Sequence, residues 1–372
     1  MSPRGMEAFC ARGRHMAFLS EDLRRHALQH FWKKGFGEKL MDGPLGNEWG
    51  KDLLLFSLAR HALLEGLRLA GVREGDAVML PEFICRELLA SVHLAGARSV
   101  FYPVNECLGP VSFPEGEKVK AVLAVDYFGF PQNLEPFREL CQKHGAVLLE
   151  DNAHGFLSRD PAGQLLGRRG DMGILSLRKT FPLPDGGALI LNQPGQDRTH
   201  LHSLSFRNAP LPLSYRLKSL LRVVQRHTGI PLKTAGESAI RLARQLRTGE
   251  PFPKSAPDCE NVIPMAPPMH SESCRLLGAQ NTDREAERRK QLYGEVRDRL
   301  RHLPASPVFP SLEAGTVPYG YPFRAESSVA KTAAAIARGM GFDCSLWPEL
   351  PAAIESSAPP HYRNIYWVNF LC

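Results

Sequence analysis

Cysteine is sparse in this chain, and long hydrophobic runs are missing. Eight cysteines occur among 372 residues, and no two of them form a CxxC pair. Because zinc sites need clustered ligands and disulfide scaffolds need a higher cysteine density, we expect neither a metal site nor disulfides. No apolar stretch approaches the roughly 20 residues that a helix needs to cross a bilayer. The basic N-terminus lacks the apolar core and cleavage site of a secretory signal, so we expect a cytoplasmic protein.

The chain also lacks the compositional bias of a disordered or fibrous protein. Hydrophobic residues make up 43% and charged residues 23%, which is ordinary for a soluble globular protein, and the length indicates two domains. The net charge of +7 is mild, and its basic excess is concentrated between residues 207 and 254. Since no recognition motif accompanies these arginines, we expect no nucleic-acid partner.

Strand-like and helix-like segments alternate between residues 53 and 192. The apolar periodicity predicts a helix over residues 53–70 and another over residues 132–144. Nearly continuous apolar runs at residues 119–128 and 146–153 are typical of strands that are buried on both faces of a parallel sheet. This alternation predicts an α/β domain with a mostly parallel sheet flanked by helices, and a ligand site at the carboxyl ends of its strands.

The character of the chain changes after Asn192. A long, charged, amphipathic helix is predicted over residues 273–303, and the segments beyond it indicate a small α+β domain. We therefore expect three parts, which are an N-terminal extension at residues 1–46, a large α/β domain at residues 47–255 with a basic helical segment at residues 200–255, and a small C-terminal α+β domain at residues 256–372.

Candidate ligand-binding groups follow the predicted strands. Backbone N–H groups near Ala59 and Arg60 open a helix, where they can hold a phosphate; an ordinary capped helix is the alternative. Asp151 ends a strand, with His154 close behind it. A carboxylate in that position can pair with a buried cation, such as a protonated ring nitrogen, or it can cap the next helix.

Lys179 lies between a short apolar strand and the Gly186-Gly187 turn. A lysine amine becomes a nucleophile when burial or neighbouring cations lower its pKa, and Arg169 and Arg178 are the cations closest in sequence. The pattern indicates a lysine that can form a Schiff base. A solvated surface charge is the alternative.

Taken together, these segments resemble the DegT/DnrJ/EryC1/StrS family of sugar aminotransferases. That family has the aspartate-aminotransferase fold, fold type I, and uses pyridoxal 5′-phosphate (PLP). The resemblance is strongest in VKAVLAVDYFGFPQNLEPFRELCQKHGAVLLEDNAHG, and it also includes LARHALLEGLRLAGVREGDAVMLPEF. Gly170-Asp171, Leu175-Ser176, Lys179 and Asp185-Gly186-Gly187 follow in the family's order. The resemblance extends from about residue 47 to residue 192 and continues loosely to WPELP.

The resemblance implies a role for each matching residue. Lys179 matches the lysine that binds PLP covalently and then moves protons, Asp151 matches the acid that pairs with the pyridinium nitrogen, and His154 matches the residue set against the ring or its phenolic oxygen. This pairing would keep the ring nitrogen protonated, so that the cofactor can accept electrons.

The family's phosphate and ring contacts match less closely. Ser176 matches the hydroxyl on the phosphate, together with the backbone around Ala59 and Arg60, but Ser176 precedes the lysine by three residues where the family has five. Cys85 occupies the position at which an aromatic side chain often covers the ring, and Phe83 is the other candidate for that role.

The function that the resemblance implies is amino transfer from glutamate to a nucleotide-linked keto sugar, by a homodimer. Two alternatives stay open, which are sugar dehydration on the same fold and a non-catalytic protein that binds PLP or a partner. Histidine commonly replaces the lysine in the dehydratases, so Lys179 favours transamination. The amphipathic stretch at residues 216–226 could also rest on an anionic membrane surface, with packing against the protein as the alternative.

Overall fold

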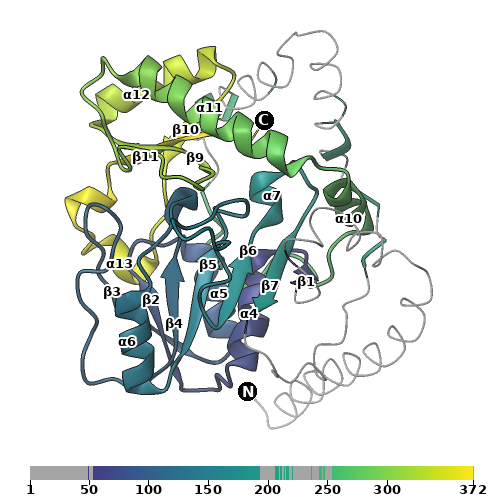
Figure 1. Ribbon diagram of the computed structural model, residues 1–372, viewed down its shortest axis with the longest axis vertical. Coiled ribbons are helices and arrows are strands. Elements are labelled where there is room, and N and C mark those ends of the chain that lie inside the picture. Colours follow the sequence, from purple (N-terminus) through teal and green to yellow (C-terminus); the bar gives the residue numbers. More distant parts are fainter. Residues whose placement is uncertain are drawn as a thin grey trace.

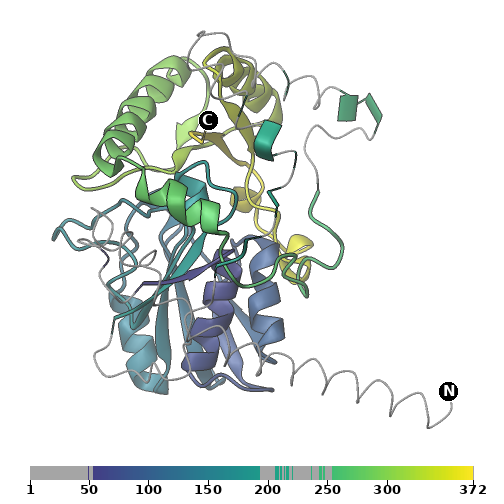
Figure 2. The same ribbon diagram turned by 90° about the vertical axis from the view of Figure 1, so that its right-hand side faces the viewer.

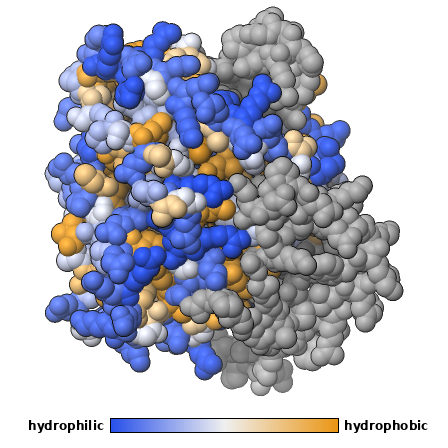
Figure 3. Space-filling model, in the orientation of Figure 1, coloured by the Kyte–Doolittle hydropathy of each residue, from blue (hydrophilic) through white to orange (hydrophobic). Residues whose placement is uncertain are grey.

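The computed structural model describes Trp49, residues 53–192, 206–208 and 254–371, and isolated positions between 210 and 247. The predicted N-terminal extension lies outside the described residues, and so do most of the basic helical segment and most of the stretch proposed for membrane contact. Among the helices that are described, none combines the length and the apolarity needed to cross a bilayer. On the face shown in Figure 3, hydrophilic side chains dominate and hydrophobic ones form scattered patches.

Seven strands form the sheet of the large domain, in the order β1-β7-β6-β5-β4-β2-β3. Six of them run in one direction, and β7 runs antiparallel to both of its neighbours. The mostly parallel sheet predicted from the sequence is therefore confirmed, with the apolar β4 and β5 at its centre. The strands are β1 (Leu53–Phe56), β2 (Ala77–Pro81), β3 (Arg98–Tyr102), β4 (Val119–Val125), β5 (Val147–Asn152), β6 (Met172–Leu175) and β7 (Gly187–Leu191).

Helices cover both faces of this sheet, as a parallel sheet with crossover connections requires. Figure 2 shows the sheet between α6 (Glu135–His144) on one side and α4 (Ala59–Leu69) and α5 (Leu89–Leu94) on the other. Helix α4 packs mainly on β7 and β6, whereas α6 packs on β4 and β5. The side chains that line the carboxyl ends of the strands are thus held by a rigid three-layer scaffold.

The prediction of a helix over residues 53–70 is wrong for its first residues. Residues 53–56 form β1, which pairs antiparallel with β7 so that Leu53 lies opposite Ile190, and the helix begins only at Ala59. A short apolar run such as LLLF fits a strand as well as a helix. Pairing with β7 decides between them, because it satisfies the backbone groups of the edge strand β1 that face β7.

The small domain is built on an antiparallel sheet in the order β10-β11-β9-β8. Figure 1 shows it beyond the carboxyl ends of the large sheet, with α11 and α12 covering it. The predicted α+β character of this part is confirmed. Its elements are α11 (Thr282–Leu300), β8 (Ser306–Pro307), β9 (Gly320–Arg324), α12 (Ser327–Gly339), β10 (Asp343–Leu346), α13 (Ala352–Glu355) and β11 (Ile365–Asn369).

The single helix predicted over residues 273–303 is instead two helices. Helix α10 (Ser271–Gly278) ends before α11 begins, and the side chain of Asn281 caps α11 by accepting a hydrogen bond from the N–H of Arg284 at 2.8 Å. Helix α10 buries Cys274 and Leu277 in a hydrophobic cluster with residues of β6 and β7. Residues 271–278 therefore pack on the large domain, and the boundary predicted at residue 255 stays a prediction.

Candidate active site

One pocket gathers seven of the eight site residues that the sequence predicts. It lies at the carboxyl ends of β4, β5 and β6, where ligands bind in α/β sheets of this kind. The seven residues come from four separate segments of the large domain. They are Ala59, Arg60, Cys85, Asp151, His154, Ser176 and Lys179.

Lys179 reaches the pocket from α7 (Leu177–Thr180), a single helical turn that follows β6 directly. Its Nζ lies 3.0 Å from Nε2 of His154. Burial lowers the pKa of Lys179 below its ordinary value; the positive charge of Arg178 adds to this effect, whereas Cys85 and Asp151 act against it. The environment thus favours the neutral amine, which is the nucleophilic form.

The hydrogen bonds of His154 indicate which of its ring nitrogens carries the proton. The backbone N–H of Phe128, in the turn η4 (Tyr127–Gly129), donates to Nδ1 of His154 at 3.1 Å. Because a backbone N–H can only donate, Nδ1 accepts, and the proton of the neutral ring is on Nε2. Burial, followed by the charge of Lys179, lowers the pKa of His154 well below its usual value and keeps the ring neutral. Nε2–H therefore points at the Lys179 amine, which accepts it.

Asp151 presents a buried carboxylate on the same side of the sheet. The residue is 6% exposed, and one of its oxygens accepts a hydrogen bond from the N–H of Ala153 at 3.0 Å. Burial raises the pKa of Asp151, while the positive charge of Lys179 and the Ala153 N–H act against the rise. A buried carboxylate of this kind is stabilised by a cationic partner, such as a protonated ring nitrogen.

Arg169 does not act on Lys179, contrary to the expectation that it would help to lower the lysine pKa. Its Nε binds Glu150 at 2.7 Å and its Nη2 binds Asp126 at 2.6 Å, in a buried cluster. Successive residues of a strand point to opposite faces, so Glu150 turns away from the pocket that Asp151 enters. Of the two arginines named, only Arg178 lines the pocket.

The start of α4 offers open backbone donors. Its N-cap residue, Leu58, makes no side-chain cap hydrogen bond, so no side chain of that residue satisfies the first N–H groups of the helix. The first N–H groups of a helix have no partner within the helix, and Ala59 and Arg60, which supply two of them, line the pocket, so an anion can bind there. A Cβ on Gly187 would lie 2.2 Å from the nitrogen of Ala59, so only glycine lets β7 approach this helix start so closely.

Ser176 and Cys85 complete the pocket of the large domain. Ser176 is buried on the pocket wall and occupies the N-cap position of α7 in extended conformation, without a side-chain cap hydrogen bond. The thiol of Cys85 donates to Glu87 at 3.2 Å, and burial together with the Glu87 charge raises its pKa to about 12. Cys85 is therefore a neutral thiol at physiological pH.

Phe83 is the one predicted site residue that the structure does not bring to the pocket. Its fully buried ring packs edge-on against Trp347, with a centroid distance of 5.4 Å. Trp347, from the small domain, lines the pocket and packs against the His154 ring at 5.2 Å. Trp347 is thus an aromatic side chain of the pocket wall, which sequence reasoning missed because about 170 residues separate it from Lys179 along the chain.

Tyr319 is a second contribution of the small domain that sequence reasoning missed. Its ring stacks on His154 with centroids 4.5 Å apart, and Nζ of Lys179 lies 5.8 Å from the centre of the same ring. Its N–H donates to the carbonyl oxygen of Phe128 at 2.8 Å. Nothing in the spacing of GTVPYGYPF marks this tyrosine, and only the packing of β9 against η4 reveals it.

The part of the chain that the structure describes contains no set of side chains suited to bind a metal ion. No group of three or more His, Cys, Asp or Glu side chains there is arranged to hold an ion. The polar groups of the pocket, namely an amine, an imidazole, a carboxylate and open backbone N–H groups, are instead suited to an organic ligand that has a carbonyl, a ring nitrogen and a phosphate.

Comparison with known proteins confirms the resemblance stated from the sequence. Residues 53–209 match the model of the DegT/DnrJ/EryC1/StrS aminotransferase family. Over 143 residues the chain is 29% identical to the GDP-perosamine synthase of Vibrio cholerae, a match that covers 37% of this chain and 38% of that protein. It is 30% identical over 132 residues to the UDP-N-acetyl-3-dehydro-alpha-D-glucosamine 3-aminotransferase of Acidithiobacillus ferrooxidans, covering 34% of this chain and 35% of that protein.

The fold extends further than the sequence match. The crystal structure of the aminotransferase TlmJ from Streptoalloteichus hindustanus superposes with a TM-score of 0.61 at 20% identity, covering 93% of this chain and 90% of that one. The sequence matches reach less than half of each curated relative, whereas the structural match covers both domains. The predicted fold, type I of the PLP-dependent transferases, is confirmed.

Proposed function

From the match of residues 53–209 to the model of the DegT/DnrJ/EryC1/StrS aminotransferase family, we propose that the chain is a PLP-dependent aminotransferase acting on a nucleotide-linked keto sugar. One observation carries the proposal. Lys179 lies with its Nζ 3.0 Å from a neutral His154, in the same pocket as the buried Asp151 and the open start of α4. The names of the relatives support the substrate class, because one of them is a 3-aminotransferase of a UDP-linked dehydro sugar.

The residues of the pocket fit PLP. The Lys179 amine would hold the aldehyde carbon, Asp151 would hold the ring nitrogen, and the N–H groups at the start of α4 would hold the phosphate together with Ser176. Bound there, PLP supplies an electron sink for the bond that loses a proton in amino transfer. The buried carboxylate is the group that needs this ligand most, since a protonated ring nitrogen gives it a cationic partner.

The protein's own part in the reaction is to hold and move a proton. Nζ of Lys179 can take a proton from the substrate carbon and return it two atoms further along, in a 1,3-shift, because burial lowers its pKa and so raises the share of free amine that can accept a proton. His154 holds Nζ in place through Nε2 while its own ring stays neutral. Trp347 and Tyr319 exclude water from the small-domain side of the amine.

The presence of Lys179 favours transamination over dehydration, because the dehydratase alternative has histidine in that position. The same pocket holds the Lys179 amine, the Asp151 carboxylate and the residues at the start of α4 proposed to bind the phosphate, and this combination likewise favours an enzyme over a binding protein. As further parts of the proposal, glutamate is the amino donor, the active form is a homodimer, and the protein works in the cytoplasm.

The absorbance of the purified protein tests the proposal. We expect PLP added to the protein to produce a band near the violet edge of the visible spectrum, and borohydride to fix the cofactor on Lys179. Lys179→Ala should abolish both, because Lys179 is the lysine that shares the pocket with Asp151 among the described residues, while replacing Lys143, an exposed lysine of α6, by alanine should change neither. A wild-type protein that binds no PLP, or a Lys179→Ala variant that keeps the band, would refute the assignment.

A further inference from the structure

Arg289 is a buried arginine whose contacts join the small domain to the candidate catalytic lysine. It lies on α11 and is 1% exposed. Its Nε donates to Glu285 at 2.7 Å. Its Nη2 donates to the carbonyl oxygens of Lys179 at 3.3 Å and Thr180 at 2.8 Å. Figure 1 shows α7 between the end of β6 and α11, which is where this contact forms.

The other side of the same guanidinium binds the small domain. Nη1 of Arg289 donates to the carbonyl oxygens of Pro318 at 3.4 Å and Tyr319 at 3.0 Å, immediately before β9. With Glu285 and the two carbonyls of α7, these acceptors match the five N–H groups of a guanidinium one for one. A lysine in this position has three N–H groups and no planar fork, so it cannot replace the whole set.

Helix α7 needs such a contact, because it is too short to hold itself. It spans four residues, and the last carbonyls of any helix lack partners within the helix. Two of those carbonyls, of Lys179 and Thr180, bind Arg289. The turn that carries the amine is therefore fixed at its carboxyl end by α11, and the amine itself is fixed by His154.

We propose that Arg289 is a positioning residue that holds Lys179 in its reactive place and makes that place depend on the docking of the small domain. The inference rests on the proposed function for the role of Lys179, but not for the contact. Arg289 fixes the lysine backbone and, through the carbonyl of Tyr319, the aromatic ring that covers the amine. A displacement of α11 thereby moves both the amine and its cover.

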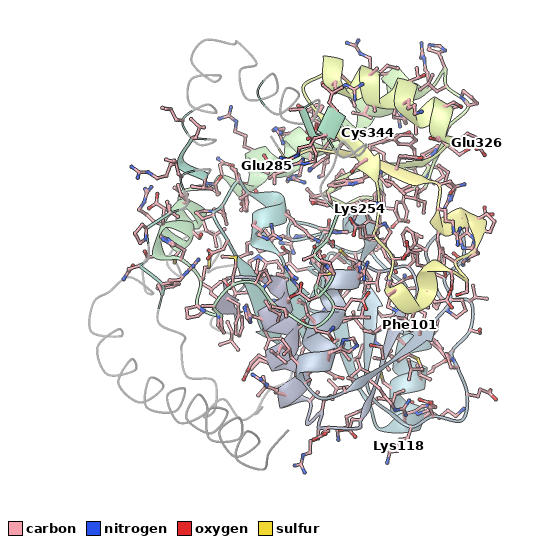
Figure 4. The ribbon with its side chains drawn as sticks, turned by 180° about the vertical axis from the view of Figure 1, so that it is seen from behind. Phe101, Lys118, Lys254, Glu285, Glu326 and Cys344 are labelled. Atoms are coloured by element: carbon pink, nitrogen blue, oxygen red, sulfur yellow. The ribbon has the colours of Figure 1, made fainter. Side chains whose placement is uncertain are left out.

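The neighbouring Arg288 provides a matched control. It lies on the same helix and binds the same Glu285, at 3.0 Å, and it also donates to the carbonyl oxygen of Phe370, at 2.9 Å; its hydrogen bonds to described residues do not include α7. Figure 4 labels Glu285 on the part of α11 that faces the large domain. Replacing Arg288 therefore removes an arginine from the same place in the fold without removing the contact to Lys179.

The test measures the Lys179 amine without any cofactor. Trace labelling of the PLP-free protein with acetic anhydride over a range of pH, read by mass spectrometry, gives the pH midpoint of Lys179, with the exposed Lys143 as internal reference. In the wild type we expect a midpoint below that of Lys143, because burial lowers the pKa of Lys179. In Arg289→Gln and Arg289→Lys the midpoint should rise by roughly one pH unit, because the freed turn lets the amine become hydrated. Arg288→Gln should keep the wild-type midpoint.

Each outcome decides the matter. An unchanged midpoint in both Arg289 variants, or an equal shift in Arg288→Gln, would overturn the positioning role. A wild-type midpoint in Arg289→Lys alone would reduce the role of Arg289 to its charge, and would overturn the proposal too. If neither Arg289 variant folds, Glu285→Gln decides: it should shift the midpoint in the same direction by a smaller amount, and no shift would contradict the proposal. PLP absorbance of the wild type, measured separately, tests the proposed function and leaves this result intact.

Discussion

Gly187 is the position at which a single methyl group would disturb the proposed phosphate site most directly. It begins β7, pairs with Phe56 of β1, and lies against the start of α4. A Cβ there would lie 2.2 Å from the nitrogen of Ala59 and 2.3 Å from the carbonyl carbon of Leu58. Both contacted atoms are backbone, so no side-chain rotation relieves the overlap. In Gly187→Ala, either β7 or the helix start must move.

The size of the effect follows from that geometry. Overpacking a well-packed site costs about 1–3 kcal/mol, and a backbone overlap of this kind belongs at the upper end of that range. The N–H groups that move are those proposed to bind the phosphate, so binding should weaken as well. Because about 1.4 kcal/mol corresponds to a tenfold change in affinity, we expect PLP to bind at least about tenfold more weakly.

Two measurements check this prediction, and a second glycine-to-alanine variant that should stabilise the protein serves as the control. Urea unfolding gives the change in free energy of unfolding, and titration with PLP, followed by its absorbance, gives the affinity. Gly294→Ala is the control, because a Cβ there meets no atom within 4 Å in the interior of α11 and should stabilise the helix by roughly 0.5–1 kcal/mol. If Gly187→Ala unfolds at the wild-type midpoint and binds PLP normally, the close approach of β7 to α4 is not what shapes the phosphate site.

Two further predictions concern buried carboxylates. Asp151→Asn keeps the size of the side chain but removes the charge proposed to hold the ring nitrogen of PLP protonated. Turnover should therefore fall by orders of magnitude, and PLP should bind more weakly. Near-normal turnover would rule out the ion pair. Arg169→Met leaves Glu150 and Asp126 buried without their cation and should cost about 3–5 kcal/mol of unfolding free energy at neutral pH. Burial and the nearby Glu150 already raise the pKa of Asp126, so the folded variant binds more protons than the unfolded chain. The loss of unfolding free energy in Arg169→Met, relative to the wild type, should therefore shrink as the pH is lowered below neutral. A loss that does not change with pH would contradict this reasoning.

Most of the large domain could be predicted from the sequence, because its central strands carry their signal locally. The apolar runs that form β4 and β5 lie where they were expected, and Asp151, near the end of β5, lines the pocket. Parallel strands bring their carboxyl ends to one edge, so residues as distant as Asp151 and Lys179 could be grouped without a structure. The roles taken from the family resemblance did not follow from such patterns.

The errors occurred where a partner distant in sequence decides the conformation, or where a strong periodicity conceals a local signal. The run at residues 53–56 is a strand because β7 pairs with it, and no local signal records that pairing. The expected helix over residues 273–303 is broken at Asn281, a residue suited to an N-cap that the charged periodicity on either side conceals. Trp347 and Tyr319 reach the pocket only because the small domain docks over it.

Arg289 could nevertheless have been recognised, because it breaks the pattern of its own helix. The buried residues of α11 are Arg289, Tyr293, Val296 and Leu300, which recur at three- and four-residue spacing along one face. Three of these positions are apolar or aromatic, as the face of a helix against a core requires, and the fourth is an arginine. A guanidinium on that face must find acceptors for all its N–H groups, because burying it unpaired is far costlier than exposing it. In a helix as rich in arginine as this one, the informative cation is the one on the apolar stripe, and its acceptors here are the carbonyls of the turn that carries Lys179.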